Sequence, residues 1–180
     1  MMKTRMEDIL PGKKRLKRAY VAIMLWIVGR AIGVAARVDE DVKREFEELP
    51  EGFSFALSIY PQGPCMTVGK DEKGNVKFMG LKESTTLSLK MNIKTLEAAI
   101  LIFTFRESTA MAYARERFFV DGDIPDALAV VRVLNRIETY LLPKFITKMA
   151  VKRYPTWSEL SPLKKHWNRI VIYLGTFTVG

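Results

Sequence analysis

The chain has 180 residues, of which 48% are hydrophobic and 27% charged, the composition of a folded domain with a sizeable core rather than of a disordered chain. Its single cysteine excludes an internal disulfide, and one cysteine with one histidine is too small a set for a zinc site without several carboxylates. The net charge of +9 leaves nucleic acid, an anionic membrane surface and plain solubility open as explanations.

The N-terminal part of the chain has a basic, an apolar and an acidic stretch in turn. Residues 13–18 read KKRLKR, residues 19–29 read AYVAIMLWIVG, and the apolar pattern continues past Arg30 to Ala36. Together they predict a long helix. Residues 39–51, DEDVKREFEELPE, hold seven carboxylates against two bases and indicate a solvated end of that helix.

Three interpretations of this N-terminal helix stay open. It resembles a secretory signal, it has some features of a membrane-spanning anchor, and it fits a helix that packs on the domain or lies on a membrane. Arg30 cuts the apolar run short of the about 20 residues that a spanning helix needs, and it stands late for a signal peptide. We therefore favour the third interpretation.

A sheet-forming region follows. Residues 53–60, FSFALSIY, alternate as a half-buried strand does. Residues 65–70 and 75–80 flank the turn DEKGN, which predicts a β-hairpin, and residues 85–92, TTLSLKMN, alternate again.

Helical patterns come next. Residues 93–105, IKTLEAAILIFTF, are apolar almost all round and predict a buried helix, and a short helix and the strand RFFVDG follow. A last helix of this region is predicted over 124–142, capped by Asp123 and ended by Pro143. Its apolar stripe is Ala127, Val130, Val131, Leu134, Ile137 and Leu141.

The tail beyond Pro143 is basic and carries a further helical pattern over 163–177. The order of elements predicts an α+β fold, an antiparallel sheet with helices on one face plus added N-terminal and C-terminal helices. We divide the chain into an N-terminal helix and acidic connector (1–50), a central domain (51–143) and a basic tail (144–180).

Polar residues of the catalytic types have ordinary explanations in this sequence. His166 has no nucleophile or carboxylate beside it, and Cys65 sits in an alternating strand as a plain thiol. Asp121 and Asp123 fit a turn and a helix cap. We expect no catalytic residues, no metal, no cofactor and no enzymatic activity.

The central region resembles the sterol carrier protein type-two family of lipid-binding domains. The residues that carry the resemblance are FSFALSIY, VGKDEKGNVKFMG, LSLKMNIKTLEAAILIF and above all FFVDGDIPDALAVVRVL. The resemblance implies a sterol-carrier-like sheet with helices, between which a fatty acyl chain, sterol, quinone or similar lipid is held. The residues that would line that space are Phe55, Leu57, Leu87, Leu89, Ile100, Phe103, Phe118, Val130 and Leu134.

The alternative for these apolar residues is a filled core. The chain would then be a membrane-associated structural or accessory protein that supports a lipid-related enzyme. In either case we expect a cytoplasmic protein, peripheral at the inner membrane surface, and nucleic acid is disfavoured because no helix-turn-helix or RNA-binding motif is present. The bases expected at anionic lipid are Lys13, Lys14, Arg15, Lys17, Arg18, Lys164, Lys165 and Arg169.

Overall fold

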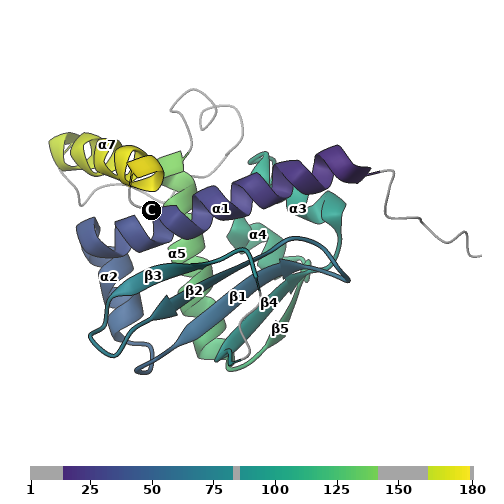
Figure 1. Cartoon of the computed structure of the whole chain (residues 1–180), viewed down its shortest axis with the longest axis horizontal. Helices are drawn as coiled ribbons and strands as arrows, with labels where there is room; N and C mark the ends of the chain where they lie inside the picture. The colour runs from purple at the N-terminus through teal and green to yellow at the C-terminus, as the bar shows by residue number, and fades with distance from the viewer. Residues whose placement is uncertain (1–13, 83–85, 142–161, 179–180) are drawn as a thin grey trace, which may run out of the picture.

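A sheet with helices on one face makes up the described part of the chain, residues 14–82, 86–141 and 162–178 of a computed structural model (Figure 1). Of the last helix, the side chains of residues 162–166, 169 and 177 are not described. The helices are α1 (Arg15–Val38), α2 (Glu40–Glu47), α3 (Leu96–Phe103), α4 (Thr109–Ala114), α5 (Ile124–Leu141) and α7 (Pro162–Thr178). The strands are β1 (Ser54–Ile59), β2 (Cys65–Lys70), β3 (Val76–Gly80), β4 (Leu89–Ile93) and β5 (Phe118–Asp121). The predicted α+β class is confirmed.

The sheet has the strand order β3-β2-β1-β4-β5 and is mixed, whereas the sequence predicts an antiparallel sheet. β1 pairs antiparallel with β2 and parallel with β4. The described ends of the connection from β3 to β4 lie on the face of the sheet opposite the helices. On that face the Thr67 hydroxyl donates to the Lys82 carbonyl at 2.7 Å, and the Ser54 hydroxyl donates to the Thr86 carbonyl at 3.1 Å. All six residues of β1, expected to be half-buried, are buried because the strand is central and covered on both sides.

The hairpin and the turn before α5 follow the predicted turn chemistry. Between β2 and β3, Asp71 accepts the backbone N–H of Asn75 at 2.8 Å, and Gly74 has a φ of +79°. Gly122, between β5 and α5, has a φ of +133°, and a Cβ there would lie 2.8 Å from the carbonyl oxygen of Ser88. Only glycine fits a position with both constraints.

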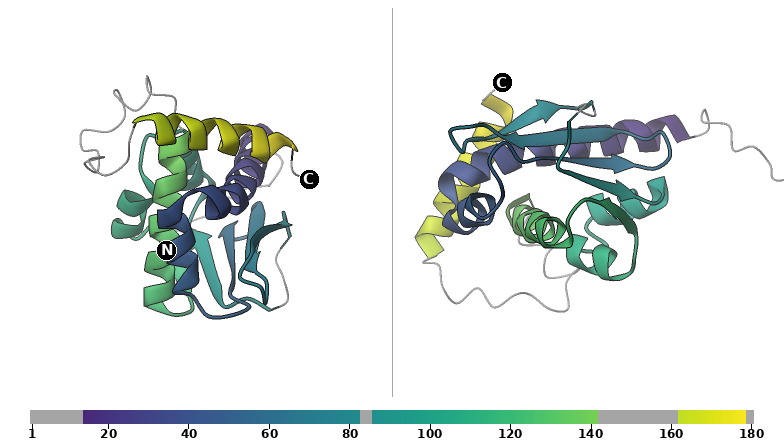
Figure 2. Two further views of the ribbon diagram at one scale, coloured as in Figure 1. Left: turned by 90° about the vertical axis from the view of Figure 1, so that its left-hand side faces the viewer. Right: turned by 90° about the horizontal axis from the view of Figure 1, so that it is seen from below.

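Helix α1 packs lengthwise across the helical side of the sheet (Figure 2). A Cβ on Gly29 would lie 2.5 Å from the ring of Phe78 on β3, so this small residue permits close approach to a strand. By length and composition α1 is the one helix among the described residues that is apolar enough to cross a bilayer, and 56% of its most apolar window is buried inside the domain. The structure thus shows α1 packed on the domain.

The acidic stretch after α1 forms a helix of its own, α2, because Asp39 ends one helix and caps the next. Its carboxylate accepts the Asp41 N–H at 2.9 Å and is 2% exposed. Arg136 Nε of α5 donates to it at 2.8 Å, and the Tyr140 hydroxyl donates to the same oxygen. Burial acts to raise the pKa of Asp39, but these hydrogen bonds outweigh it and hold the pKa below its ordinary value.

Helix α7 crosses α1 and completes the helical layer (Figures 1 and 2). A Cβ on Gly175 would lie 2.9 Å from the side chain of Val34, Asn168 donates to the Val38 carbonyl at 3.1 Å, and Ile172 is buried. The described parts of all three predicted segments therefore share one hydrophobic core.

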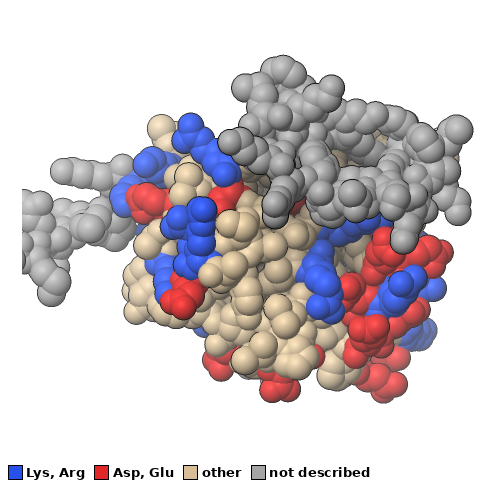
Figure 3. Space-filling model, turned by 180° about the vertical axis from the view of Figure 1, so that it is seen from behind, with Lys and Arg blue, Asp and Glu red and all other residues tan. Residues whose placement is uncertain are grey.

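Charged side chains are unevenly spread over the surface. From behind, uncharged residues cover the middle of the molecule, and Asp and Glu gather toward the end that carries α2 (Figure 3). The acidic helix α2 follows the C-terminal end of α1, so it is separated by the length of α1 from the basic residues at the start of that helix.

Candidate functional site

A small cavity lies between the sheet and α5. Its volume is about 20 Å³, room for about one water molecule. The sheet contributes Leu57, Ile93 and Phe118 to its wall. The helices contribute Val28, Ile102, Phe103, Leu134, Ile137 and Leu141. Phe105, Thr109 and Glu138 complete the lining, which is apolar apart from the last two.

Four of the nine residues predicted to line a lipid site are at this cavity, and five are elsewhere. Those at the cavity are Leu57, Phe103, Phe118 and Leu134. Phe55, Leu89 and Val130 are buried in the surrounding core, and Ile100 is half-buried on α3. Leu87 is half-buried in a separate groove on the opposite face of the sheet. The predicted lining as a set stays a prediction.

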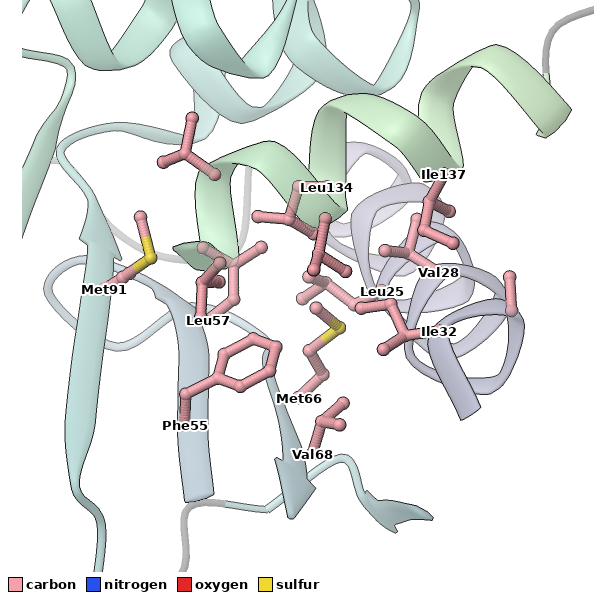
Figure 4. Packing of buried hydrophobic residues seen from close by; sticks show 14 of the residues in the cluster. Leu25, Val28, Ile32, Phe55, Leu57, Met66, Val68, Met91, Leu134 and Ile137 are labelled. Atoms are coloured by element: carbon pink, nitrogen blue, oxygen red, sulfur yellow. The ribbon is translucent and has the colours of Figure 1, made fainter. Parts of the chain in front are cut away.

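Side chains of α1, the sheet and α5 pack together in one hydrophobic core. Figure 4 shows part of this packing from close by. The labelled members are Leu25, Val28 and Ile32 of α1, Phe55, Leu57, Met66, Val68 and Met91 of the sheet, and Leu134 and Ile137 of α5. Helix α1, which the sequence predicts to lie outside the central domain, therefore contributes side chains to the core of that domain.

The cavity has one ionisable group, Glu138, which the sequence analysis did not single out. Its Oε1 accepts the Thr109 N–H at 2.9 Å and also the Thr109 hydroxyl. Burial raises the pKa of Glu138 to about 7, although both hydrogen bonds from Thr109 act to lower it. The spacing along the sequence could have identified it, because a residue four positions after Leu134 and three before Leu141 lies on the apolar face of α5.

Two of the bases predicted to meet anionic lipid have partners within the protein. Lys14 Nζ lies 2.6 Å from Glu97 Oε1, and Arg18 donates to the Gln62 carbonyl. Arg15 and Lys17 are exposed. Lys13 lies outside the described residues, as do the side chains of Lys164, Lys165 and Arg169.

Exposed apolar side chains form a stripe on each of the two outer helices. On α1 they are Leu16, which is 87% exposed, and Ile23, one heptad further on. On α7 they are Trp167, Ile170 and Leu174, spaced for one helix face, and Trp167 is 68% exposed. These side chains are the most exposed apolar surface that the two helices present among the described residues.

Comparison with known proteins gives matches to solved structures only. No protein-family model matches the chain, and no curated protein matches it. Among the structures it is similar to a UbiJ-SCP2 ubiquinone synthesis protein, at 12% identity over 69% of this chain and 98% of that one, with a TM-score of 0.41. It is also similar to sterol carrier protein 2 like 2 from Aedes aegypti (16% identity, 53% of this chain and 94% of that one, TM-score 0.33). A third is sterol carrier protein domain 2 of Helicoverpa armigera (12% identity, 61% and 86%, TM-score 0.34). The likeness concerns the fold alone.

Proposed function

We propose that the chain binds an apolar molecule, a fatty acyl chain, sterol, quinone or similar lipid, between its sheet and helices and does so at a membrane surface. The observation that carries this proposal is the cavity beneath α5, which has an apolar wall and a single, half-buried carboxyl group, that of Glu138. The resemblance of the central sequence to the sterol carrier family adds the ligand class. No reaction is part of the proposal.

Binding requires the cavity to widen, because about 20 Å³ is far less than a lipid occupies. The wall between α3 and α4 is the part we expect to move. α4 has six residues, and Phe105 holds a φ of 59°, a left-handed conformation that a bulky residue rarely adopts. Short elements with strained connections open at lower free energy than central strands do.

The membrane part of the proposal rests on the start of α1. Leu16 and Ile23 present exposed apolar surface there, and Arg15 and Lys17 are exposed beside them. A helix with this pairing binds anionic bilayers by burying the apolar side chains and attracting the headgroups. Each base contributes on the order of 1 kcal/mol near such a surface.

Mass spectrometry of lipids extracted from the purified protein tests ligand binding. A recurrent lipid, present at a constant ratio to protein after repeated chromatography, is expected. Protein that stays folded and carries no lipid, and that takes up none from mixed vesicles, contradicts the carrier function.

Vesicle flotation tests the membrane contact. The double variant Arg15→Glu with Lys17→Glu is expected to weaken binding to phosphatidylserine vesicles by about tenfold or more at low salt. Lys73→Glu with Arg106→Glu, two exposed bases elsewhere, is the charge-matched control and should bind like the wild type. Equal loss in both variants, or no binding by the wild type, contradicts a specific contact through α1.

A filled-core accessory protein is the second candidate. The observation that favours it is the same small cavity, since α1 already covers the apolar face of the sheet. The extraction experiment separates the two functions, because the accessory protein would be stable and free of lipid.

A further inference from the structure

Glu138 occupies a place where an apolar side chain would ordinarily stand. Its neighbours on α5, Leu134, Ile137 and Leu141, line the cavity with it. Across the cavity lie Val28 of α1 and Phe118 of β5. Burying a carboxyl group among such residues is costly unless its oxygens have hydrogen-bond partners.

Only one of its two oxygens is used within the described residues. Thr109 donates to Oε1 from both its N–H and its hydroxyl, so this oxygen also satisfies the first amide of α4. Asn135 supports the next amide of α4, whose N–H lies 3.5 Å from Oδ1. Oε2 has no hydrogen-bond partner in the described part of the chain. Capping α4 therefore explains one oxygen of Glu138, a half-buried residue that lines the cavity, and leaves the second oxygen without a role in the described fold.

No described charge lies close enough to set the state of Glu138, since burial and Thr109 are the causes of its pKa shift. Arg106, in the segment before α4, is exposed, and other charged groups of the packed neighbours are paired elsewhere. Glu107, before α4, lies 2.6 Å from both Arg115 and Arg117. On the α2 side, Asp39 and Glu45 pair with Arg136 and Arg132 of α5. Near neutral pH the group is therefore poised between its neutral and ionised forms.

We propose that Glu138 Oε2 is the polar contact of the ligand site, and that the site takes an apolar molecule with an uncharged oxygen, an alcohol or a carbonyl compound, in preference to a fatty acid anion. This inference rests on the proposed binding of an apolar ligand and deepens it. In its neutral form the carboxyl group donates to a ketone or hydroxyl oxygen, and in its ionised form it accepts from a hydroxyl. A carboxylate ligand would place two like charges in one apolar space, which is strongly unfavourable.

Equilibrium dialysis of two lipids with the same chain, lauryl alcohol and laurate, tests the inference. At about pH 8 the wild type is expected to bind the alcohol roughly tenfold or more tightly than the acid, the ratio that one pKa unit of repulsion produces. In Glu138→Gln, which keeps an oxygen acceptor for Thr109, the ratio should fall toward one because laurate binds better. It should also fall in the wild type at about pH 5, where carboxyl groups become neutral. Glu72→Gln, which changes an exposed glutamate, should keep the wild-type ratio.

Circular dichroism of each variant shows that it is folded under the same conditions. Equal binding of both lipids by the wild type at about pH 8, or an unchanged ratio in Glu138→Gln, overturns the role of Glu138 and leaves apolar binding intact. Absence of binding of either lipid overturns the proposed function and this inference with it.

Discussion

Replacing Glu138 by Gln should change how the stability of the protein depends on pH. The pKa of this group is about 7 in the folded protein and 4.5 when it is exposed on unfolding. Between those values the folded state holds a proton that the unfolded state has released. The free energy of unfolding contributed by this group is therefore fully present below about pH 4.5 and is lost as pH rises through about 7.

The size of the effect follows from the difference between the two pKa values, about 2.5. At about 1.4 kcal/mol for each pKa unit, the full change is about 3 kcal/mol, of which about 2 to 3 kcal/mol falls between about pH 5 and pH 8. Glutamine does not titrate, so relative to the wild type the variant should become more stable by that amount over the same range. Exposed Glu72→Gln should show no such change.

Urea unfolding followed by circular dichroism at half-unit pH intervals measures both free energies. The comparison uses the difference between variant and wild type at each pH, so that the titration of all other groups cancels. A difference that stays constant within about 0.5 kcal/mol from pH 5 to pH 8 would refute the burial of the carboxyl group. A difference with the opposite slope would show a carboxylate held ionised by a cation.

Two further substitutions test the packing around α5 by the same unfolding measurement. Arg136→Met should lower the free energy of unfolding by about 3 to 5 kcal/mol, because it leaves Asp39 buried without its cation, whereas Arg132→Met at an exposed pair should cost about 1 kcal/mol or less. Equal costs would contradict the burial of Asp39. Gly122→Ala should cost about 2 kcal/mol or more through the contact with Ser88, and Gly52→Ala, which also has a positive φ but faces open space, should cost less. If both variants lose the same free energy of unfolding, the positive φ alone explains the loss and the contact with Ser88 does not contribute.

The parts of the fold that the sequence predicts are those that local chemistry determines. The hairpin follows from Asp71, Gly74 and Asn75, which bond to one another within five residues. The start of α5 follows from the Gly122-Asp123 step and the apolar stripe after it. The parallel pairing of β1 with β4 is not predictable in this way, because it depends on where the chain passes after β3.

The candidate site is only partly predictable, for two physical reasons. Strand alternation identifies Leu57 as inward-facing, and the helical stripe does the same for Leu134, but neither pattern says whether another side chain or a cavity lies opposite. That depends on α1, whose position on the sheet is set by contacts such as Gly29 with Phe78, about fifty residues apart in sequence. Glu138 was missed because a stripe is read from its apolar members, and a carboxyl group on the same face looks like a solvated neighbour.

The close packing around the cavity decides how much Glu138 can contribute to ligand selection. A lipid that entered would displace apolar side chains from apolar surroundings, so the gain of about 0.8 kcal/mol for each buried methylene is offset by the packing that the displaced side chains give up. The chain length of the guest then contributes little net discrimination. A hydrogen bond to Glu138 has no such offset, because Oε2 has no partner to give up among the described residues, and a typical hydrogen bond contributes about 0.5 to 1.5 kcal/mol. The polar end of the guest, rather than its apolar body, should therefore decide which molecule this protein selects.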